Sequence, residues 1–136
     1  GCVQKGGKAA ISDVLAYAEP VHTKGLNLLY GPGNDLVSST NLTAAGCTVI
    51  LFTTGRGTPF GAPAPVAKIA TNDRLAERKA NWIDFNAGPV ASQGESVDDA
   101  GRRLLDLVKE IASGKKTKAE QNGFREISIF KDGVVL

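Results

Sequence analysis

The stretch TVILFTTGRGTPFGAPAPVAKIATN, residues 48–72, carries the strongest structural signal in this chain. It contains two predicted strands, 48–52 and 66–70, and the first is an apolar run without alternation of apolar and polar residues. Such runs are typical of parallel strands that are covered on both faces. The residues between them are rich in glycine and proline and place Arg56 between two glycines. Because a long loop fed by a buried strand is usually functional or disordered, we expect 53–65 to be a functional loop.

Strands and helices alternate on both sides of this stretch. The longest predicted helix begins at Ser96, is closed by Gly114 and carries an apolar stripe at helical spacing. The other predicted helices cover about 11–18, 35–45 and 73–81, and the other predicted strands cover 26–30, 82–85 and 127–130. Strands separated by helices pair in parallel through right-handed crossovers. We therefore expect an α/β fold, a Rossmann-like three-layer domain with a mostly parallel sheet flanked by helices.

Length and composition fit one globular domain. The chain has 136 residues, of which 42% are hydrophobic, and this is enough to bury a core. Residues 1–10 are rich in glycine and lysine and are typical of a linker or the remnant of an upstream connection. We therefore expect a single α/β domain over 11–136.

Charge and hydropathy exclude several classes of partner. The formal net charge is +2, and no run of basic residues would follow a phosphate backbone, so we expect no nucleic acid partner. No apolar run approaches the roughly 20 residues that span a bilayer. The N-terminus also lacks the apolar core of a signal peptide. We expect no membrane partner and a cytoplasmic location.

Residue types that bind metals are scattered along the chain. Cys2 and Cys47 lack the spacing of a zinc site, and His22 is the single histidine. We therefore predict no metal site within this chain.

Polar residues gather where the predicted strands end, which is where ligands bind in parallel α/β sheets. The glycines around Arg56 would let the backbone approach a ligand, while the guanidinium offers two parallel donors to a carboxylate. The helix that begins near Asp35 carries hydroxyls in its early turns, including Ser39 and Thr40, and its free N–H groups could face an anion. Together these features predict an anion pocket.

Purely structural roles can also explain these glycines and hydroxyl residues. Glycine after a strand is an ordinary turn residue, and Ser or Thr in a first helical turn is an ordinary capping residue. Lys68, inside the predicted strand 66–70, either ends at a sheet surface or takes part in catalysis. The spacing of Gly55, Gly57 and Gly61 does not match GxGxxG, so we expect no nicotinamide cofactor.

Five segments together resemble one known family. They are PGND at 32–35, LFTTGRGTPFG at 51–61, KIATN at 68–72, WIDFNAG at 82–88 and GKKTKAE at 114–120. In this order they look like the C-terminal domain of the altronate/galactarate dehydratase family of sugar-acid dehydratases. The resemblance covers nearly the whole chain. The WIDF segment and the ending FREISIFKDGVVL look closer to galactarate dehydratase than to altronate dehydratase.

The resemblance implies a cytoplasmic hydro-lyase that converts galactarate to 5-dehydro-4-deoxy-D-glucarate, with altronate as the alternative substrate. A base would remove the proton beside a carboxylate, and the β-hydroxyl would then leave to give an enol that becomes a 2-keto acid. Members of the family are described as iron- or manganese-dependent, so the resemblance implies Fe²⁺ or Mn²⁺, bound mainly outside this chain. Full-length members also have an N-terminal and a large central domain, so we expect the isolated chain to be inactive.

Within this resemblance, individual residues take expected roles. Arg56 is expected to bind the substrate carboxylate, the backbone of Gly55 and Gly57 to approach the substrate closely, and Asn72 to bind a substrate hydroxyl. Hydroxyl and anion contacts are expected from Ser39, Thr40, Thr54 and Thr58. Lys68 and Asp35 are the candidates for proton transfer.

A function of another class stays open, namely a non-catalytic anion-binding or interaction module whose polar loops dock a protein partner. The partners that the resemblance implies are a small-molecule sugar acid and the central domain of the same polypeptide. The sequence leaves open whether two copies form a homodimer.

Overall fold

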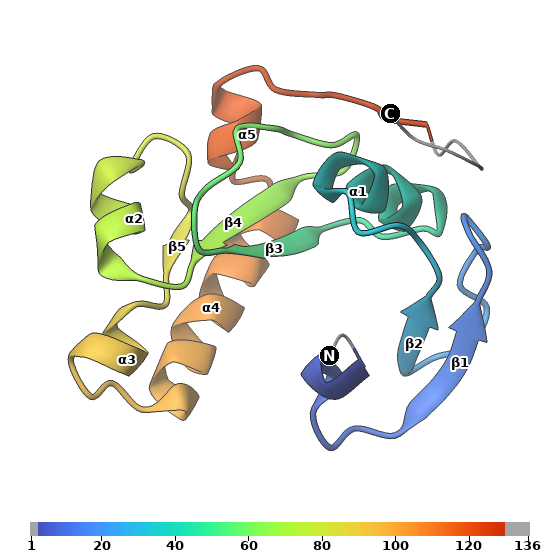
Figure 1. Ribbon diagram of the computed structural model, residues 1–136, viewed down its shortest axis with the longest axis horizontal. Helices are drawn as coiled ribbons and strands as arrows, with labels where there is room; N and C mark the ends of the chain where they lie inside the picture. The colour runs from blue at the N-terminus through green and yellow to red at the C-terminus, as the bar shows by residue number, and fades with distance from the viewer. Residues whose placement is uncertain (1–2, 130–136) are drawn as a thin grey trace. The chain divides into compact units, whose positions relative to one another are not determined.

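The computed structural model describes residues 3–129 and has an α/β architecture (Figure 1). Its strands pair in parallel and are flanked by helices, which confirms the predicted fold class. The chain divides into two compact units. The first runs to Cys47 and includes the segment that begins at Ile127, and the second is Thr48–Glu126. The described residues thus form two small parallel sheets where the sequence predicted one, and the single domain over 11–136 stays a prediction.

In the first unit, a strand takes the place of a predicted helix. β1 (Ile11–Leu15) pairs in parallel with β2 (Leu26–Leu29), so the helix predicted for 11–18 is wrong. The β-branched side chains of Ile11 and Val14 suit a strand. In so short a segment, apolar residues three positions apart fit either structure, and pairing with β2 decides between them.

The first unit also contains a 3-10 helix, η1 (Val3–Gly6), and the helix α1 (Asp35–Ala44). α1 begins where the sequence predicted because Asn34 caps it. The Asn34 Oδ1 accepts hydrogen bonds from the N–H groups of Leu36 and Val37, both at 3.1 Å.

The second unit is built on a three-stranded parallel sheet in the order β3-β4-β5. Its strands are Ile50–Thr54, Val66–Ala70 and Phe85–Asn86. The central strand β4 matches its predicted bounds, and each of its residues, Lys68 included, is buried, as expected for a strand covered on both faces. β3 and β4 pair in register over their whole length, so the two strands end side by side.

The described residues of this unit form four helices, which are α2 (Asp73–Arg78), α3 (Pro89–Ser92), α4 (Val97–Ala112) and α5 (Lys118–Gln121). α2 and α5 contact β4, and α4 passes behind the sheet in the view of Figure 1. α5 was not predicted. It begins at a capping box in which the Thr117 Oγ1 accepts the N–H of Glu120 and the Glu120 carboxylate accepts the N–H of Thr117.

The loop that follows β3 connects two parallel strands. Because one parallel strand ends where its neighbour also ends, the chain must cross back before the next strand begins, usually through a helix. Here 55–65 makes the crossover without a helix or strand, and Phe60, Gly61 and Ala62 within it are buried. The loop therefore has a structural role in addition to the predicted functional one.

The segment after α5 differs from the prediction. Residues 127–129 form no strand, and Phe130, which ends the predicted strand, lies outside the described residues. In the part of the chain that the structure describes, no helix has the length and apolar character needed to cross a bilayer.

Candidate functional site

A hollow of about 420 Å³ lies at the carboxyl ends of β3 and β4. This is the edge at which ligands bind in parallel α/β sheets, and the volume is within the range of about 300–1,000 Å³ that is typical of small-molecule sites. The residues that line it come from the loop after β3 and from the turn and helix after β4, and they are Gly55, Arg56, Asn72, Arg74, Leu75, Arg78 and Lys79. The structure therefore brings together three predicted site residues, Gly55, Arg56 and Asn72.

Side-chain hydrogen bonds shape the wall that the loop provides. The N–H of Gly57 donates to the Thr54 Oγ1 at 2.9 Å, and the Asn72 Nδ2 donates to the carbonyl of Gly55 at 3.1 Å. The Asn72 Oδ1 accepts the N–H of Leu75 at 2.9 Å as the N-cap of α2. Asn72, predicted to bind a substrate hydroxyl, thus uses both ends of its amide to join the loop to α2.

Gly57 meets a backbone requirement that Gly55 does not share. Its φ of 84° lies in the left-handed region that favours glycine. A Cβ at Gly57 would lie 3.0 Å from the Cδ1 of Leu75, whereas a Cβ at Gly55 would meet only the Thr71 Oγ1 at 3.5 Å, an ordinary contact. The absence of a side chain at Gly57 therefore lets the loop lie close against α2.

Basic residues dominate the hollow. Arg56, Arg74, Arg78 and Lys79 line it, and no acidic residue does. The three arginines are exposed, and the Lys79 Nζ lies 4.2 Å from the centroid of the Trp82 ring, a cation–π contact. Among the described residues, none of the four forms an ion pair. Positive charge without a partner creates a field that attracts anions to this edge.

The basic residues of α2 are absent from the site predicted from the sequence. The predicted helix over 73–81 has the character of a polar surface element, and its charges gave no reason to choose among them. The usable signal was position: Arg74 and Arg78 are four residues apart, so they share a helix face, and they follow the strand end that leads to Asn72.

Ser39, Thr40 and Asp35 lie on α1, in the first unit. The Ser39 Oγ donates to the carbonyl of Asp35 at 2.8 Å, and the Thr40 Oγ1 donates to the carbonyl of Leu36 at 2.9 Å. The Thr40 Oγ1 also accepts the N–H of Ser128 at 3.1 Å. Both hydroxyls thus bond to the backbone of their own unit, and the predicted roles of these three residues stay predictions.

Lys68 and Thr58 do not line the hollow. Lys68 is only 1% exposed, and its Nζ lies 4.7 Å from the centroid of the Phe60 ring. Burial lowers the pKa of Lys68, and the nearby carboxylates of Asp84 and Glu126 oppose that shift. Because Lys68 is buried, a solute in the hollow does not reach it in the described conformation, and its proton-transfer role stays a prediction.

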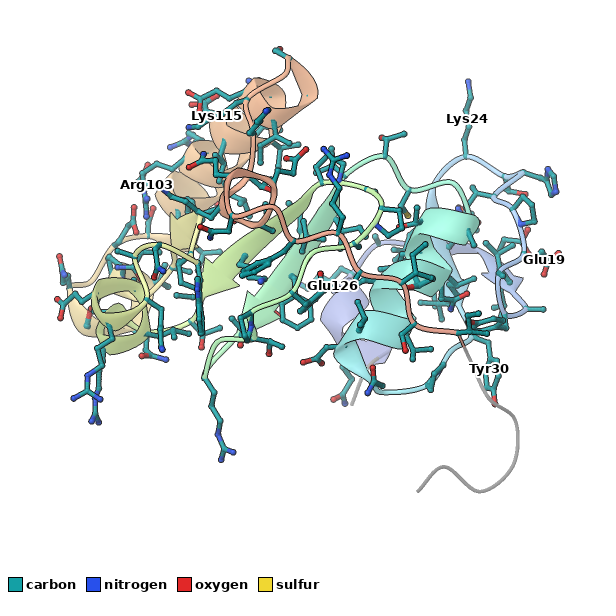
Figure 2. The ribbon with its side chains drawn as sticks, turned by 90° about the horizontal axis from the view of Figure 1, so that it is seen from above. Glu19, Lys24, Tyr30, Arg103, Lys115 and Glu126 are labelled. Atoms are coloured by element: carbon teal, nitrogen blue, oxygen red, sulfur yellow. The ribbon has the colours of Figure 1, made fainter. Side chains whose placement is uncertain are left out.

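The two carboxylates near Lys68 bind backbone N–H groups. Asp84 accepts from the N–H groups of Lys68 and Lys118 at 2.8 and 2.7 Å. Glu126, which Figure 2 labels on the segment after α5, accepts from the N–H of Gly61 at 2.8 Å. Burial raises the pKa of Asp84, while its hydrogen bonds oppose the shift. The cluster joins the loop, β4 and the segment after α5.

Metal ligands do not gather in this chain as the structure describes it. Within residues 3–129, no three His, Cys, Asp or Glu side chains lie where they could hold one ion. The described residues therefore do not fit the iron or manganese that the resemblance implies.

Known proteins resemble this chain over its whole length. The sequence profile of a family described as "D-galactarate/Altronate dehydratase, C-terminal" matches residues 1–135. The chain is 51% identical to an altronate dehydratase from Bacillus subtilis and 49% identical to one from Escherichia coli, each over 100% of the chain and 27% of the relative. It is 39% identical to a galactarate dehydratase (L-threo-forming) from Escherichia coli, over 99% of the chain and 26% of the relative. The chain thus spans 26–27% of the length of these relatives.

Proposed function

Because this chain belongs to the D-galactarate/altronate dehydratase family and matches its C-terminal domain, we propose that it provides a carboxylate-binding wall in an enzyme that dehydrates a sugar acid. The observation that carries the proposal is the basic hollow at the ends of β3 and β4, where Arg56 is exposed and has no ion-pair partner among the described residues. A sugar acid brings a carboxylate, and the planar guanidinium fork of arginine matches carboxylate geometry.

Dehydration of a sugar acid places negative charge on the carboxylate that Arg56 would bind. Removal of the proton beside the carboxylate gives an enediolate, and departure of the β-hydroxyl as water gives an enol that tautomerises to a 2-keto acid. A guanidinium already aimed at the carboxylate stabilises this growing charge without reorganising during the reaction. Arg56 would therefore bind the substrate and also lower the barrier to proton removal.

The remaining catalytic groups would come from the rest of the full-length protein. Since the described residues do not fit Fe²⁺ or Mn²⁺, we assign the metal and the principal base to that remainder. The isolated chain is accordingly expected to be inactive.

Two sugar acids are candidate substrates. The segments WIDF and FREISIF favour galactarate, whereas the identities of 51% and 49% to altronate dehydratases, against 39% to a galactarate dehydratase, favour altronate. Both acids have a carboxylate beside a carbon that bears a proton and a hydroxyl, so Arg56 would serve either one. We place altronate first because the difference in identity extends over the whole chain.

Turnover by the full-length protein tests the proposal. The protein is loaded with Fe²⁺ or Mn²⁺ and given altronate or galactarate, and the 2-keto product is measured. Hydrogen bonds to charged groups contribute about 1.5–3 kcal/mol, so Arg56→Ala is expected to lower kcat/KM by about tenfold to a hundredfold. Arg102→Ala is the matched control, because Arg102 is an exposed arginine that pairs with Asp99 on α4, away from the hollow.

The outcomes separate the two classes of function. If the folded, metal-loaded protein turns over neither acid, the dehydratase proposal fails, and an anion-binding or interaction module describes the chain better. If the protein is active and Arg56→Ala behaves like Arg102→Ala, the enzyme assignment stands but the role of Arg56 is wrong.

A further inference from the structure

The hollow holds more positive charge than one carboxylate needs. Arg56 lies on its loop side, and Arg74, Arg78 and Lys79 lie on its α2 side. An aldonic acid such as altronate has one carboxylate, whereas an aldaric acid such as galactarate has one at each end. The distribution of charge over two walls therefore fits a ligand with two separated anionic groups.

Four basic residues on and just after α4 form ion pairs. Each lies within 3.2 Å of a carboxylate oxygen, and the four are Arg102, Arg103, Lys109 and Lys115. Figure 2 labels Arg103 and Lys115. The basic residues of the hollow have no such partner in the described part of the chain. Because like charges around one small volume repel, a dianion relieves more repulsion there than a monoanion does.

The donors available on the α2 side are the two arginines. Lys79 already contacts the ring of Trp82. Leu75 of α2 is buried, and its apolar side chain has no donor. Arg74 and Arg78 are exposed, and their Cβ atoms lie about 5–6 Å apart on one helix face, as expected at i,i+4. Two guanidinium groups at this spacing can bind one carboxylate from both sides.

We propose that Arg74 and Arg78 form a second carboxylate subsite, which would hold the far carboxylate of an aldaric acid such as galactarate. The inference rests on the proposed function, in which Arg56 binds the carboxylate next to the reacting carbon. The second carboxylate takes no part in the chemistry, and the same elements of water leave the substrate. Arg74 and Arg78 therefore determine specificity without touching the reacting atoms.

The test compares two acids and two double variants of the full-length protein. Arg74→Gln with Arg78→Gln removes the subsite, while Arg102→Gln with Lys109→Gln removes two exposed charges that are paired on α4. Turnover is measured with metal-loaded protein, and binding of galactarate and altronate is measured by calorimetry without metal. The subsite variant is expected to weaken kcat/KM and binding for galactarate by about tenfold or more, and for altronate by less than about threefold. The control variant is expected to change neither, and Arg56→Ala to weaken both.

The subsite proposal would be overturned if the subsite variant lost binding and turnover equally for the two acids, or lost neither. It would also be overturned if the wild-type protein neither bound nor converted galactarate. If no acid is turned over, the proposed function fails. Calorimetry then still decides the subsite, because a selective loss of galactarate binding needs no catalysis.

Discussion

Gly61 shows how closely the loop between β3 and β4 packs against the segment after α5. Its N–H donates to the Glu126 Oε2 at 2.8 Å, and its carbonyl accepts the N–H of Glu126 at 3.3 Å. A Cβ at this position would lie 2.0 Å from the carbonyl oxygen of Phe124. Because the obstacle is backbone, a larger residue could fit only if the two segments separated.

Gly61→Ala is therefore expected to destabilise the protein by about 1–3 kcal/mol, the usual cost of overpacking. The free energy of unfolding in urea measures the effect. Gly55→Ala is the control in the same loop, since its Cβ would meet only the Thr71 Oγ1 at 3.5 Å, and we expect a change within about 1 kcal/mol. Similar losses in the two variants would show that the contact with Phe124 does not set the cost.

Lys68 illustrates a buried charge whose surroundings support structure. Burial lowers the pKa of Lys68 and raises the pKa of Asp84, because it disfavours the charged form of each group. Their mutual attraction opposes both shifts, and Asp84 also accepts two backbone N–H groups. The two hydrogen bonds of Asp84 thereby join β4 to the start of α5.

At the scale of elements, Asp73 links the start of α2 to its neighbours. Its Oδ2 accepts a hydrogen bond from the Ser92 Oγ on α3, and its Oδ1 accepts one from the Asn86 Nδ2 on β5 at 2.7 Å. These bonds, with that of Ser92 the largest cause, lower the pKa of Asp73 below its ordinary value of 3.8. The charged carboxylate therefore helps to hold α2, one wall of the hollow, in place.

Ser92→Ala is expected to lower the urea midpoint in a pH-dependent way. Since the folded pKa of Asp73 is depressed, its stabilisation is fully present above the unfolded pKa and is lost as pH falls through the folded value. The loss of stability caused by Ser92→Ala should be largest near neutral pH. It should shrink as the pH falls below 3.8, the ordinary pKa of Asp73. A small loss of stability should remain at low pH, because the Ser92 Oγ also donates to the carbonyl of Gly88 at 3.1 Å.

Asn122→Ala provides the control for this pH series. The Asn122 Nδ2 donates to the carbonyl of Asn81 at 2.8 Å, and this acceptor does not titrate. Its deficit should stay constant with pH, and a deficit of Ser92→Ala that is equally constant would contradict the role of Asp73.

Elements with a single strong signal were predictable from the sequence. β4 matched its predicted bounds because a short, mostly apolar segment that follows a loop rich in glycine and proline has few alternatives to a buried strand. β1 was predicted as a helix because Ile11, Val14 and Leu15 recur at helical spacing, whereas pairing with the distant strand β2 makes the segment a strand. α5 was missed although Thr117 and Glu120 form a capping box, since the lysines around it favoured a solvated connection.

The candidate site was predictable where it depends on strand ends. Arg56 and Asn72 follow two strands that end side by side, and topology alone places them together. The contribution of Arg74 and Arg78 depends on how α2 folds back beside the loop, which local sequence does not specify. The burial of Lys68 depends on Phe60, a residue of the loop that covers it.

At the scale of the molecule, net charge conceals an uneven distribution. The formal net charge is only +2. The basic side chains on and just after α4 are neutralised locally by ion pairs, whereas those that line the hollow are not. A local excess of positive charge attracts anions over a distance that salt limits. The Debye length falls from about 10 Å at 0.1 M salt to about 3 Å at 1 M.

Binding of a sugar acid to the full-length protein should therefore weaken as salt increases. We expect the dissociation constant for galactarate, measured by calorimetry, to rise between about 0.1 M and about 1 M NaCl. Arg74→Gln with Arg78→Gln should make this dependence shallower, because it removes two of the four charges that line the hollow. Arg102→Gln with Lys109→Gln should keep the wild-type dependence, because the carboxylates of Asp99 and Asp106 already offset those charges. If both double variants show the same dependence, attraction would arise from the overall charge of the protein and not from the hollow.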